Sequence, residues 1–395
     1  MDKNVDFSSL SIREEVFELY EEMVQLRRDM HRVPELMFDL PFTREIILKY
    51  LKNLGLKIYE QVGKAGIVAV IENPGPCILL RADMDALNIT ERNEKEYQSI
   101  HTGNMHACGH DGHVTMLLIA AKVLSKMKLS GSVKFLFQPA EEGGHGAREM
   151  ILDSGYPVLE NPSVDSVYGI HLTNAVKMGN IVAAPQWASC SSDYFFIEII
   201  GKGGHASAPF LTIDPISAGC QLVVTLQTIV SRNVDPKHQA VLSVTMFHSG
   251  EVFNAIPDDC KIRGTIRTFE PEVRALIEKR IHEICAGIES GFSCKVQLRF
   301  EHFYDPIENN EACANQCAAT FKKISPQGTR GIVAPLIGED FFYFTNARPG
   351  CFMMLGCGTD ELDAPLHSPS FDFDERAMLI GASYWVQLTL DLLSP

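Results

Sequence analysis

The chain has 395 residues, of which 46% are hydrophobic and 22% charged, and its 50 acidic and 35 basic side chains give a net charge of -15. This acidic balance argues against nucleic acid or an anionic membrane surface as a partner. Because a single hydrophobic core rarely grows beyond about 250–300 residues, a chain of this length predicts two domains.

The expected location is the cytoplasm, without membrane contact. No apolar run reaches the roughly 18 residues that a spanning helix needs, and the N-terminus Met1–Asp6 lacks the basic and then apolar pattern of a signal peptide. The 11 cysteines form no C-x-x-C pair, which is typical of reduced thiols. Cys313 and Cys317 have helical i, i+4 spacing, but without a histidine or carboxylate face beside them we interpret them as core residues.

The N-terminal part predicts two amphipathic helices, one from Ile12 to about Arg32 and one from Thr43 to Leu54, because apolar side chains recur there at helical spacing. Short apolar runs then follow, each ending in polar residues. These runs are Gly66–Ile71, Cys77–Ala82, Val133–Phe137, Val164–Ile170 and Cys351–Leu355. Such runs predict buried strands of an α/β sheet, which gathers its ligands at the carboxyl ends of the strands.

A different pattern occupies residues 187–302, where the expected elements follow the order β-α-β-β-α-β. The strands are Asp193–Ile200, Val241–Phe247, Lys261–Phe269 and Val296–Phe300, and the helices are Ile216–Val230 and Glu272–Ile288. We therefore expect residues 1–186 and 303–395 to form one domain and residues 187–302 to form a ferredoxin-like domain inserted into it.

The segment Met105–His113 carries one thiol, three imidazoles and one carboxylate in nine residues, directly before the apolar helix Val114–Leu124. A helix N-terminus favours the thiolate form of Cys108. A thiolate flanked by neutral imidazoles is a good ligand set for a transition metal. The alternative is a helix capped by Asp111 with incidental histidines.

Glu141 and Glu142 follow a predicted strand and precede a Gly-Gly loop. Two buried, ionised carboxylates repel each other. A metal removes the difficulty, since one carboxylate can bind the cation while its neighbour accepts a proton from metal-activated water. The alternative for an isolated pair of this kind is a solvated acidic loop.

Other polar residues follow strands in the same way. His171 and His367 would each usually cap or pack, but their number favours a common site. Asp83 and Asp85 follow a further strand, where a carboxylate would orient a ligand. The chain has no G-x-S-x-G, H-E-x-x-H or G-x-x-x-x-G-K motif, which argues against a serine nucleophile and a nucleotide site.

Taken together, the motifs resemble those of a known family. In chain order they are Leu26–His31, Pro34–Leu36, Arg81–Leu87, Met105–His113, Phe137–Gly143, Gly169–Leu172, Gly203–Ala206, Asn254–Pro257, Gly264–Arg267, Gly338–Phe341 and Leu366–Pro369. Over nearly its whole length the chain resembles the metal-dependent amidohydrolases that include hippurate hydrolase, N-acyl-L-amino acid amidohydrolase and the indole-3-acetyl-amino acid hydrolases, within the aminoacylase and carboxypeptidase superfamily. The resemblance implies a metallopeptidase-like α/β sheet flanked by helices, with an inserted lid domain.

The resemblance also implies roles for individual residues. The implied metal ligands are Cys108, His110, Glu142, His171 and His367. Glu141 would be the general base, and Asp85 is counted with the catalytic residues. The cofactor would be one or two divalent transition-metal ions, for which a thiolate ligand favours Mn, Zn, Co or Ni.

By the same resemblance, His205 of the inserted domain would stabilise the oxyanion, within its own chain or across a homodimer. Asn254 and Arg267 would hold the carboxylate of the substrate, a task suited to a guanidinium group. The chain departs from the family pattern at Asn88 and at Pro209–Phe210, the second of which bears on the acyl pocket.

The expected function is hydrolysis of the amide bond of N-acyl amino acids, hippurate-like or indole-acetyl-amino-acid-like, by metal-activated water. One alternative is a dipeptidase or carboxypeptidase of the same superfamily, whose pocket would accept a charged amino group. A second is a catalytically silent, ligand-binding homologue, against which the retention of Glu141 beside the ligand set argues.

Overall fold

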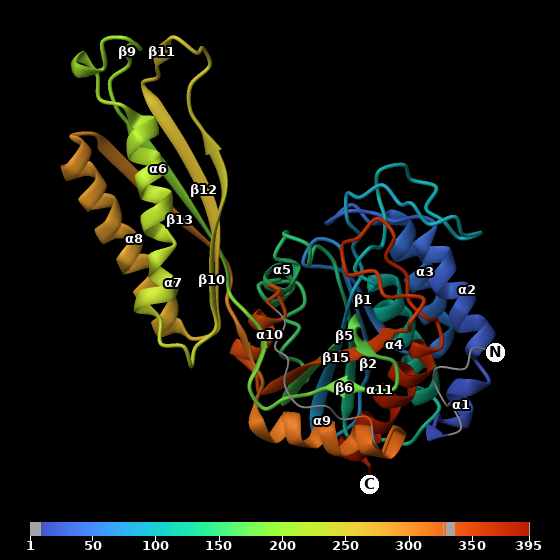
Figure 1. Ribbon diagram of the computed structural model, residues 1–395. Helices are drawn as coiled ribbons and strands as arrows, with labels where there is room; N and C mark the ends of the chain where they lie inside the picture. The colour runs from blue at the N-terminus through green and yellow to red at the C-terminus, as the bar shows by residue number, and fades with distance from the viewer. Residues whose placement is uncertain (1–8, 327, 329–335, 395) are drawn as a thin grey trace. The chain divides into compact units, whose positions relative to one another are not determined.

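The computed structural model describes residues 9–326, 328 and 336–394 (Figure 1). The described residues fall into two compact units, the first within 1–188, 308–333 and 340–395 and the second within 189–307 and 334–339. The chain leaves the first unit at β7 (Trp187–Ser189) and returns at β14 (Ile307–Glu308). Among the described helices, none is long and apolar enough to cross a membrane.

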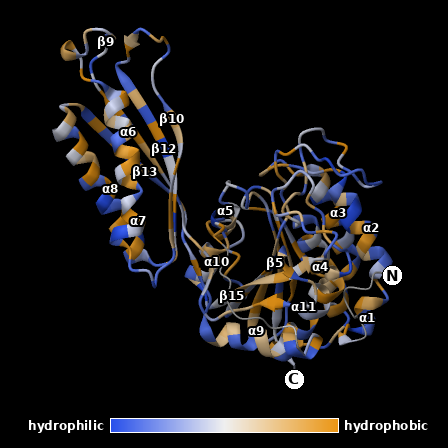
Figure 2. Cartoon of the chain, in the orientation of Figure 1, coloured by the Kyte–Doolittle hydropathy of each residue, from blue (hydrophilic) through white to orange (hydrophobic). Residues whose placement is uncertain are grey.

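The first unit is built on a seven-stranded sheet with the strand order β1-β2-β4-β3-β5-β15-β6. The strands are β1 (Lys57–Val62), β2 (Gly66–Ile71), β3 (Cys77–Asp83), β4 (Ser132–Gln138), β5 (Ser166–Lys177), β6 (Ile181–Val182) and β15 (Gly350–Gly358). Every residue of β3, β4 and β15 is buried, which explains why their sequences are mostly apolar. In Figure 2 the orange colour of hydrophobic residues runs along β5 and β15. The predicted α/β sheet is confirmed.

Parallel pairing brings the carboxyl ends of neighbouring strands to one edge of the sheet. β3 pairs in parallel with β4 and with β5, and β5 pairs in parallel with β15. Asp83, at the end of β3, lies opposite Gln138 at the end of β4, and His171 lies opposite Met354. The polar residues that follow these strands are therefore gathered at this edge.

Helices cover the sheet of the first unit (Figure 1). They are α1 (Glu14–Phe17), α2 (Tyr20–His31), α3 (Pro41–Leu51), α4 (His110–Leu124), α5 (Gly146–Ile151), α9 (Glu311–Ile324), α10 (Phe342–Ala347) and α11 (Ala377–Leu393), with a 3-10 turn η2 (Lys52–Leu54) after α3. The predicted single helix from Ile12 to Arg32 is wrong in detail, because a turn at Glu18–Leu19 separates α1 from α2. Helix α4 contacts β3, β4 and β5 as well as α2 and α11, and all but one of its residues are buried.

The second unit is a four-stranded antiparallel sheet with the strand order β10-β12-β8-β13. Its elements are β8 (Ser192–Ile200), β9 (Gly204–His205), η3 (Pro209–Leu211), α6 (Pro215–Leu226), α7 (Thr228–Asn233), β10 (Ala240–His248), β11 (Ala255–Ile256), β12 (Asp259–Thr268), α8 (Pro271–Phe292) and β13 (Lys295–Tyr304). The predicted β-α-β-β-α-β order is confirmed, except that the helix Ile216–Val230 is divided into α6 and α7. Both α6 and α8 pack on one face of the sheet (Figure 1), and alternate residues of β8 are buried accordingly.

Candidate metal centre

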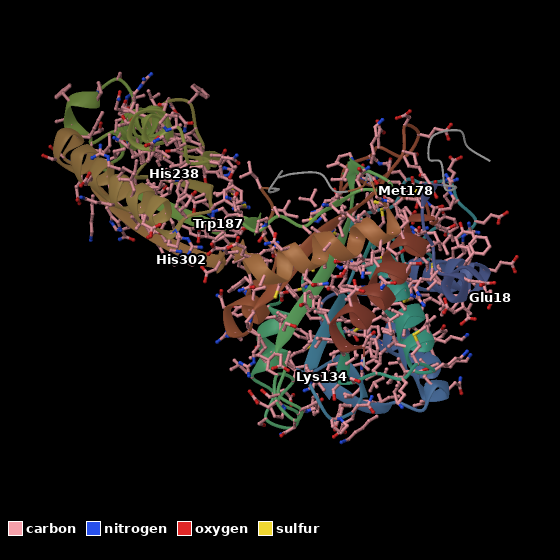
Figure 3. The ribbon with its side chains drawn as sticks, turned by 90° about the horizontal axis from the view of Figure 1, so that it is seen from below. Glu18, Lys134, Met178, Trp187, His238 and His302 are labelled. Atoms are coloured by element: carbon pink, nitrogen blue, oxygen red, sulfur yellow. The ribbon has the colours of Figure 1, made fainter. Side chains whose placement is uncertain are left out.

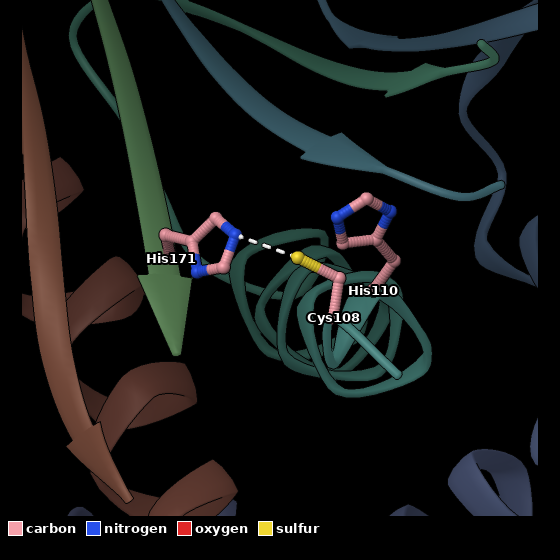
Figure 4. Close-up of side chains that lie close together, drawn as sticks. All are labelled: Cys108, His110 and His171. Carbon is pink, nitrogen blue, oxygen red and sulfur yellow. Dashed lines mark hydrogen bonds between the residues drawn. The ribbon is translucent and has the colours of Figure 1, made fainter. Parts of the chain in front are cut away.

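Cys108, His110 and His171 lie together in the first unit (Figure 4). Cys108 ends the loop before α4, His110 is the first residue of α4, and His171 lies within β5. Gly109 caps the helix with a left-handed φ of 81°, so the chain turns sharply between the two donors. The Cys108 Sγ atom lies 3.3 Å from the Nε2 atom of His171.

Backbone carbonyl groups fix the tautomer of both imidazoles. His110 Nδ1 lies 2.8 Å from the Asp85 carbonyl oxygen, and His171 Nδ1 lies 2.7 Å from the Leu172 carbonyl oxygen. Because a carbonyl only accepts hydrogen bonds, each Nδ1 carries the proton and each Nε2 presents a lone pair. Burial lowers the pKa of both rings, that of His171 strongly, so both are neutral. A neutral imidazole whose Nε2 atom carries a lone pair can bind a metal ion.

Glu142 and His367 form a second group with the Cys108 thiol. Glu142 Oε1 lies 3.2 Å from His367 Nε2, and the donor atoms of these two residues lie within 4.8 Å of each other and of Cys108. The donor atoms of Cys108, His110 and His171 also lie within 4.8 Å of one another. Cys108 therefore belongs to both groups. The His367 side chain is 52% exposed, so the cluster reaches solvent on this side.

The expectation that the helix N-terminus favours the Cys108 thiolate is wrong for the metal-free protein. Burial, followed by the charges of Glu142 and Glu141, raises the pKa of the Cys108 thiol well above its usual value. The thiol proton is then available to the lone pair of His171 Nε2. A cation at this position would replace that proton and stabilise the thiolate.

Asp85 holds the backbone of the glutamate pair. Its Oδ1 accepts the Glu141 N–H at 3.0 Å and its Oδ2 accepts the Glu142 N–H at 3.1 Å. Ala140, just before the pair, has a left-handed φ of 53°, a strained conformation for a residue with a side chain. The Glu141 carboxylate is 6% exposed and lies within 4.8 Å of the donor atoms of His110 and Glu142. Asp85 thus acts on the site through its neighbours.

His113 also lies in the cluster but is not a free ligand. Its Nδ1 lies 2.6 Å from Asp83 Oδ1, and its Nε2 accepts the Leu172 N–H at 2.8 Å, so both ring nitrogens are occupied. The sequence interpretation gave His113 no role. Its spacing of three residues from His110 indicates the same side of a helix, but not which atoms it binds. His106, the third imidazole of the segment, belongs to none of the donor groups found among the described residues.

The residues fit a bound transition metal. Among the described residues, the buried Nε2 atom of His110 has no hydrogen-bond partner, although Asp83 Oδ2 lies 3.4 Å from it. A buried polar atom without a partner is costly, and a metal ion would satisfy this one. The donor set of one sulfur, imidazole nitrogens and a carboxylate suits Zn, Mn, Co or Ni better than Mg or Ca.

The remaining predicted residues belong to the second unit. His205 Nδ1 accepts the Ser207 N–H at 3.2 Å, which leaves the exposed Nε2–H group as a donor. Asn254 is exposed directly before β11, which pairs with β9. Asn254 precedes the first residue of β12, whereas Arg267 lies near the last residue of this strand. Arg267 donates to the Ile266 carbonyl oxygen and lies over the Tyr194 ring. At about 3.3 Å per residue, the length of β12 separates Arg267 from Asn254 by roughly 25 Å.

The structure also describes the surroundings of the two departures from the family pattern, Asn88 and Pro209–Phe210. Asn88 donates to the Gly103 carbonyl oxygen at 3.1 Å. Phe210 lies in η3 of the second unit and is 82% exposed.

Comparisons with known proteins agree with this geometry. Residues 79–391 match the model of peptidase family M20/M25/M40. The chain is 37% identical to a hippurate hydrolase of Campylobacter jejuni over 96% of this chain and 98% of that protein. It is 37% identical to an IAA-amino acid hydrolase (ILR1-like 4) of Arabidopsis thaliana over 95% of this chain and 86% of that protein.

A solved structure gives the same result for the fold. The structure described as a dinuclear metal-binding peptidase of the M20 family from Bacillus subtilis superposes with a TM-score of 0.82 at 30% identity, covering 95% of this chain and 99% of that chain. The chain therefore belongs to peptidase family M20/M25/M40 and is an amidohydrolase of that family.

Proposed function

We propose that the protein hydrolyses the amide bond of N-acyl amino acids, with an aromatic acyl group such as benzoyl or indole-acetyl. The observation that carries the proposal is the convergence of Cys108, Glu142 and two neutral imidazoles beside a separate, buried carboxylate, Glu141. A silent binding protein has no chemical need for that carboxylate.

The metal would be held by the two groups that share Cys108, one with His110 and His171 and the other with Glu142 and His367. Since the two groups together offer five donor residues, we propose that they would hold two ions of Zn, Mn, Co or Ni. When bound, such ions supply Lewis acidity, which lowers the pKa of water and polarises a carbonyl group.

Glu141 is the proposed general base. Its backbone is fixed by Asp85, so its carboxylate has a defined position beside His110 and Glu142. It would accept a proton from water as the amide carbon is attacked and then deliver that proton to the nitrogen of the leaving amino acid. Asp85 is a positioning residue, because its carboxylate binds two backbone N–H groups while its carbonyl orients His110.

The second unit would supply the contacts to the substrate. The Nε2–H group of His205 would donate to the oxyanion, and Asn254 and Arg267 would bind the carboxylate of the amino acid. Because Asn254 and Arg267 lie at opposite ends of the second unit, one copy of this unit does not bring both to one carboxylate. We therefore propose a homodimer in which the second unit of one subunit contributes His205 and Asn254 to the site of its partner.

The test is hydrolysis of a small panel in the presence and absence of a chelator. After loading with Mn, Zn or Co, benzoyl- and indole-acetyl-amino acids should be cleaved in preference to acetyl-amino acids, and none of the three should be cleaved after chelation. Full activity of the chelated protein would contradict the metal requirement. Cleavage of free dipeptides in preference to acylated amino acids would replace the proposed substrate class with that of a dipeptidase.

A further inference from the structure

Asp340 belongs to the motif Gly338–Phe341, to which the proposed function assigns no role. Its side chain is fully buried in the first unit and both carboxylate oxygens are engaged. Oδ1 accepts from Arg81 Nη2 at 3.1 Å and from Gln138 Nε2 at 2.7 Å, and Oδ2 accepts the Ala147 N–H at 3.0 Å. A buried carboxylate with this many donors is held in one orientation.

Arg81 joins Asp340 to a second buried carboxylate. Its Nη1 donates to Asp83 Oδ2 at 2.7 Å and its Nε donates to Gln138 Oε1 at 2.8 Å. The guanidinium group is 1% exposed and lies between the two acids. The Arg81 guanidinium group therefore holds the Asp83 carboxylate in a fixed position.

The chain of hydrogen bonds continues from Asp83 to a proposed metal ligand. Asp83 Oδ1 binds His113 Nδ1 at 2.6 Å, and His113 Nε2 accepts the Leu172 N–H at 2.8 Å. The carbonyl group of the same residue, Leu172, accepts from His171 Nδ1 at 2.7 Å. The last contact is the one that fixes the tautomer and the ring orientation of His171.

We propose that Asp340 and Arg81 are positioning residues of the metal centre and that they act on His171 through this chain. The proposal rests on the metal centre proposed above. A residue that holds a metal-binding side chain in its orientation, without itself touching the metal, typically raises metal affinity by a factor of about 10–100. Neither residue needs to touch the substrate or the metal for this effect.

Cobalt(II) is the probe, because its visible absorption reports the geometry of its ligands and a charge-transfer band reports the thiolate. We expect Asp340→Asn to weaken Co²⁺ binding about 10–100-fold and to shift the visible bands, while the charge-transfer band of Cys108 persists. The control is Asp391→Asn, which removes a carboxylate that accepts from Thr320 and Lys323. This control should bind Co²⁺ as the wild type does.

A second variant tests the same chain of hydrogen bonds in case Asp340→Asn fails to fold. His113→Gln interrupts the chain but leaves the ion pair of Arg81 and Asp83 in place. The Co²⁺ dissociation constants of both single variants and of the double variant Asp340→Asn/His113→Gln form a double-mutant cycle. The double variant should lose no more Co²⁺ affinity than the single variant with the larger loss, because both substitutions interrupt one chain. Additive losses, or unchanged affinity in a folded His113→Gln protein, overturn the positioning role. A wild-type protein that binds no Co²⁺ would instead overturn the metal centre and the proposed function.

Discussion

Glu141 and Glu142 are adjacent in sequence, but their surroundings differ. Although burial would raise the pKa of Glu142, the imidazole of His367, 3.2 Å from Glu142 Oε1, lowers this pKa. Glu141 is more deeply buried and belongs to no group that contains the thiol. One carboxylate is therefore suited to binding a cation, and the other to carrying a proton.

This difference predicts a separation of binding from chemistry. Glu141→Gln should retain the metal content of the wild type and lose several orders of magnitude in kcat, because a carboxamide cannot accept the proton. Glu142→Gln should lose metal as well as activity. Metal content by atomic emission and kcat with benzoyl-glycine test both variants, and the opposite pattern would exchange the two roles.

Lys134 lies outside the candidate metal centre, and its burial leads us to expect that the stability of the fold depends on pH. Its side chain on β4 is fully buried, and its Nζ donates to the Val158 and Glu160 carbonyl oxygens at 2.8 and 2.6 Å (Lys134 is labelled in Figure 3). Burial lowers the pKa of Lys134 from 10.5 to about 8. Between these two values the unfolded chain keeps a proton that the folded chain has released, so stability rises with pH.

The measurement compares the wild type with Lys134→Met by chemical unfolding. Relative to this variant, the wild type should gain up to about 3 kcal/mol between pH 8 and pH 10.5. Below pH 8 the full cost of burying the ammonium group is present and the difference should be constant. A difference that stays flat over the whole range would show that Lys134 keeps its usual pKa in the fold.

At the scale of elements, the start of α4 sets the positions of Cys108 and His110. Gly109 has a φ of 81°, and a Cβ there would add conformational strain. Gly109→Ala should therefore cost about 1–2 kcal/mol of stability and weaken metal binding.

The matched control is Gly287 in α8, where an added Cβ meets nothing within 4 Å. Gly287→Ala should stabilise the protein by about 0.5–1 kcal/mol without changing metal affinity. Thermal unfolding and Co²⁺ titration of both variants check the pair. Equal stability changes in the two variants would show that the left-handed cap at Gly109 is not needed.

Elements with one strong pattern could be predicted from the sequence. The buried strand β2 is an unbroken apolar run and β3 begins with one, and the helix faces of the second unit show a clear period. The edge strand β1 was missed because its mostly exposed residues form no apolar run. Helix α11 was missed because it is buried almost all round, so its sequence shows no contrast between two faces.

The candidate site was predicted to a similar degree. The ligand types and the glutamate pair follow from motifs, and the structure brings the five proposed ligands and Glu141 together. The contacts that orient them could not be predicted, because they end on backbone atoms such as the N–H group and the carbonyl oxygen of Leu172. The thiolate form of Cys108 was predicted wrongly because the pKa of this thiol depends first on its burial and then on the charges of Glu142 and Glu141, and the sequence pattern indicates neither.

At the scale of the whole molecule, the residues proposed to act in catalysis are divided between the two units. Glu141 belongs to the first unit and His205 to the second. If the sites of a homodimer take His205 from the partner, two inactive proteins should restore each other. A subunit with His205→Ala keeps Glu141, and a subunit with Glu141→Gln keeps His205, so a mixed dimer contains one complete site.

The experiment mixes the purified Glu141→Gln and His205→Ala proteins after dissociation and reassociation. Random pairing makes half of the dimers mixed, each with one of its two sites complete, so activity should recover to about a quarter of the wild-type value. The same treatment of either variant alone is the control and should give no recovery. If His205 acts within its own subunit, every site in the mixture lacks one of the two groups. Mixed dimers confirmed by native mass spectrometry but without recovered activity would therefore place the two residues in one chain.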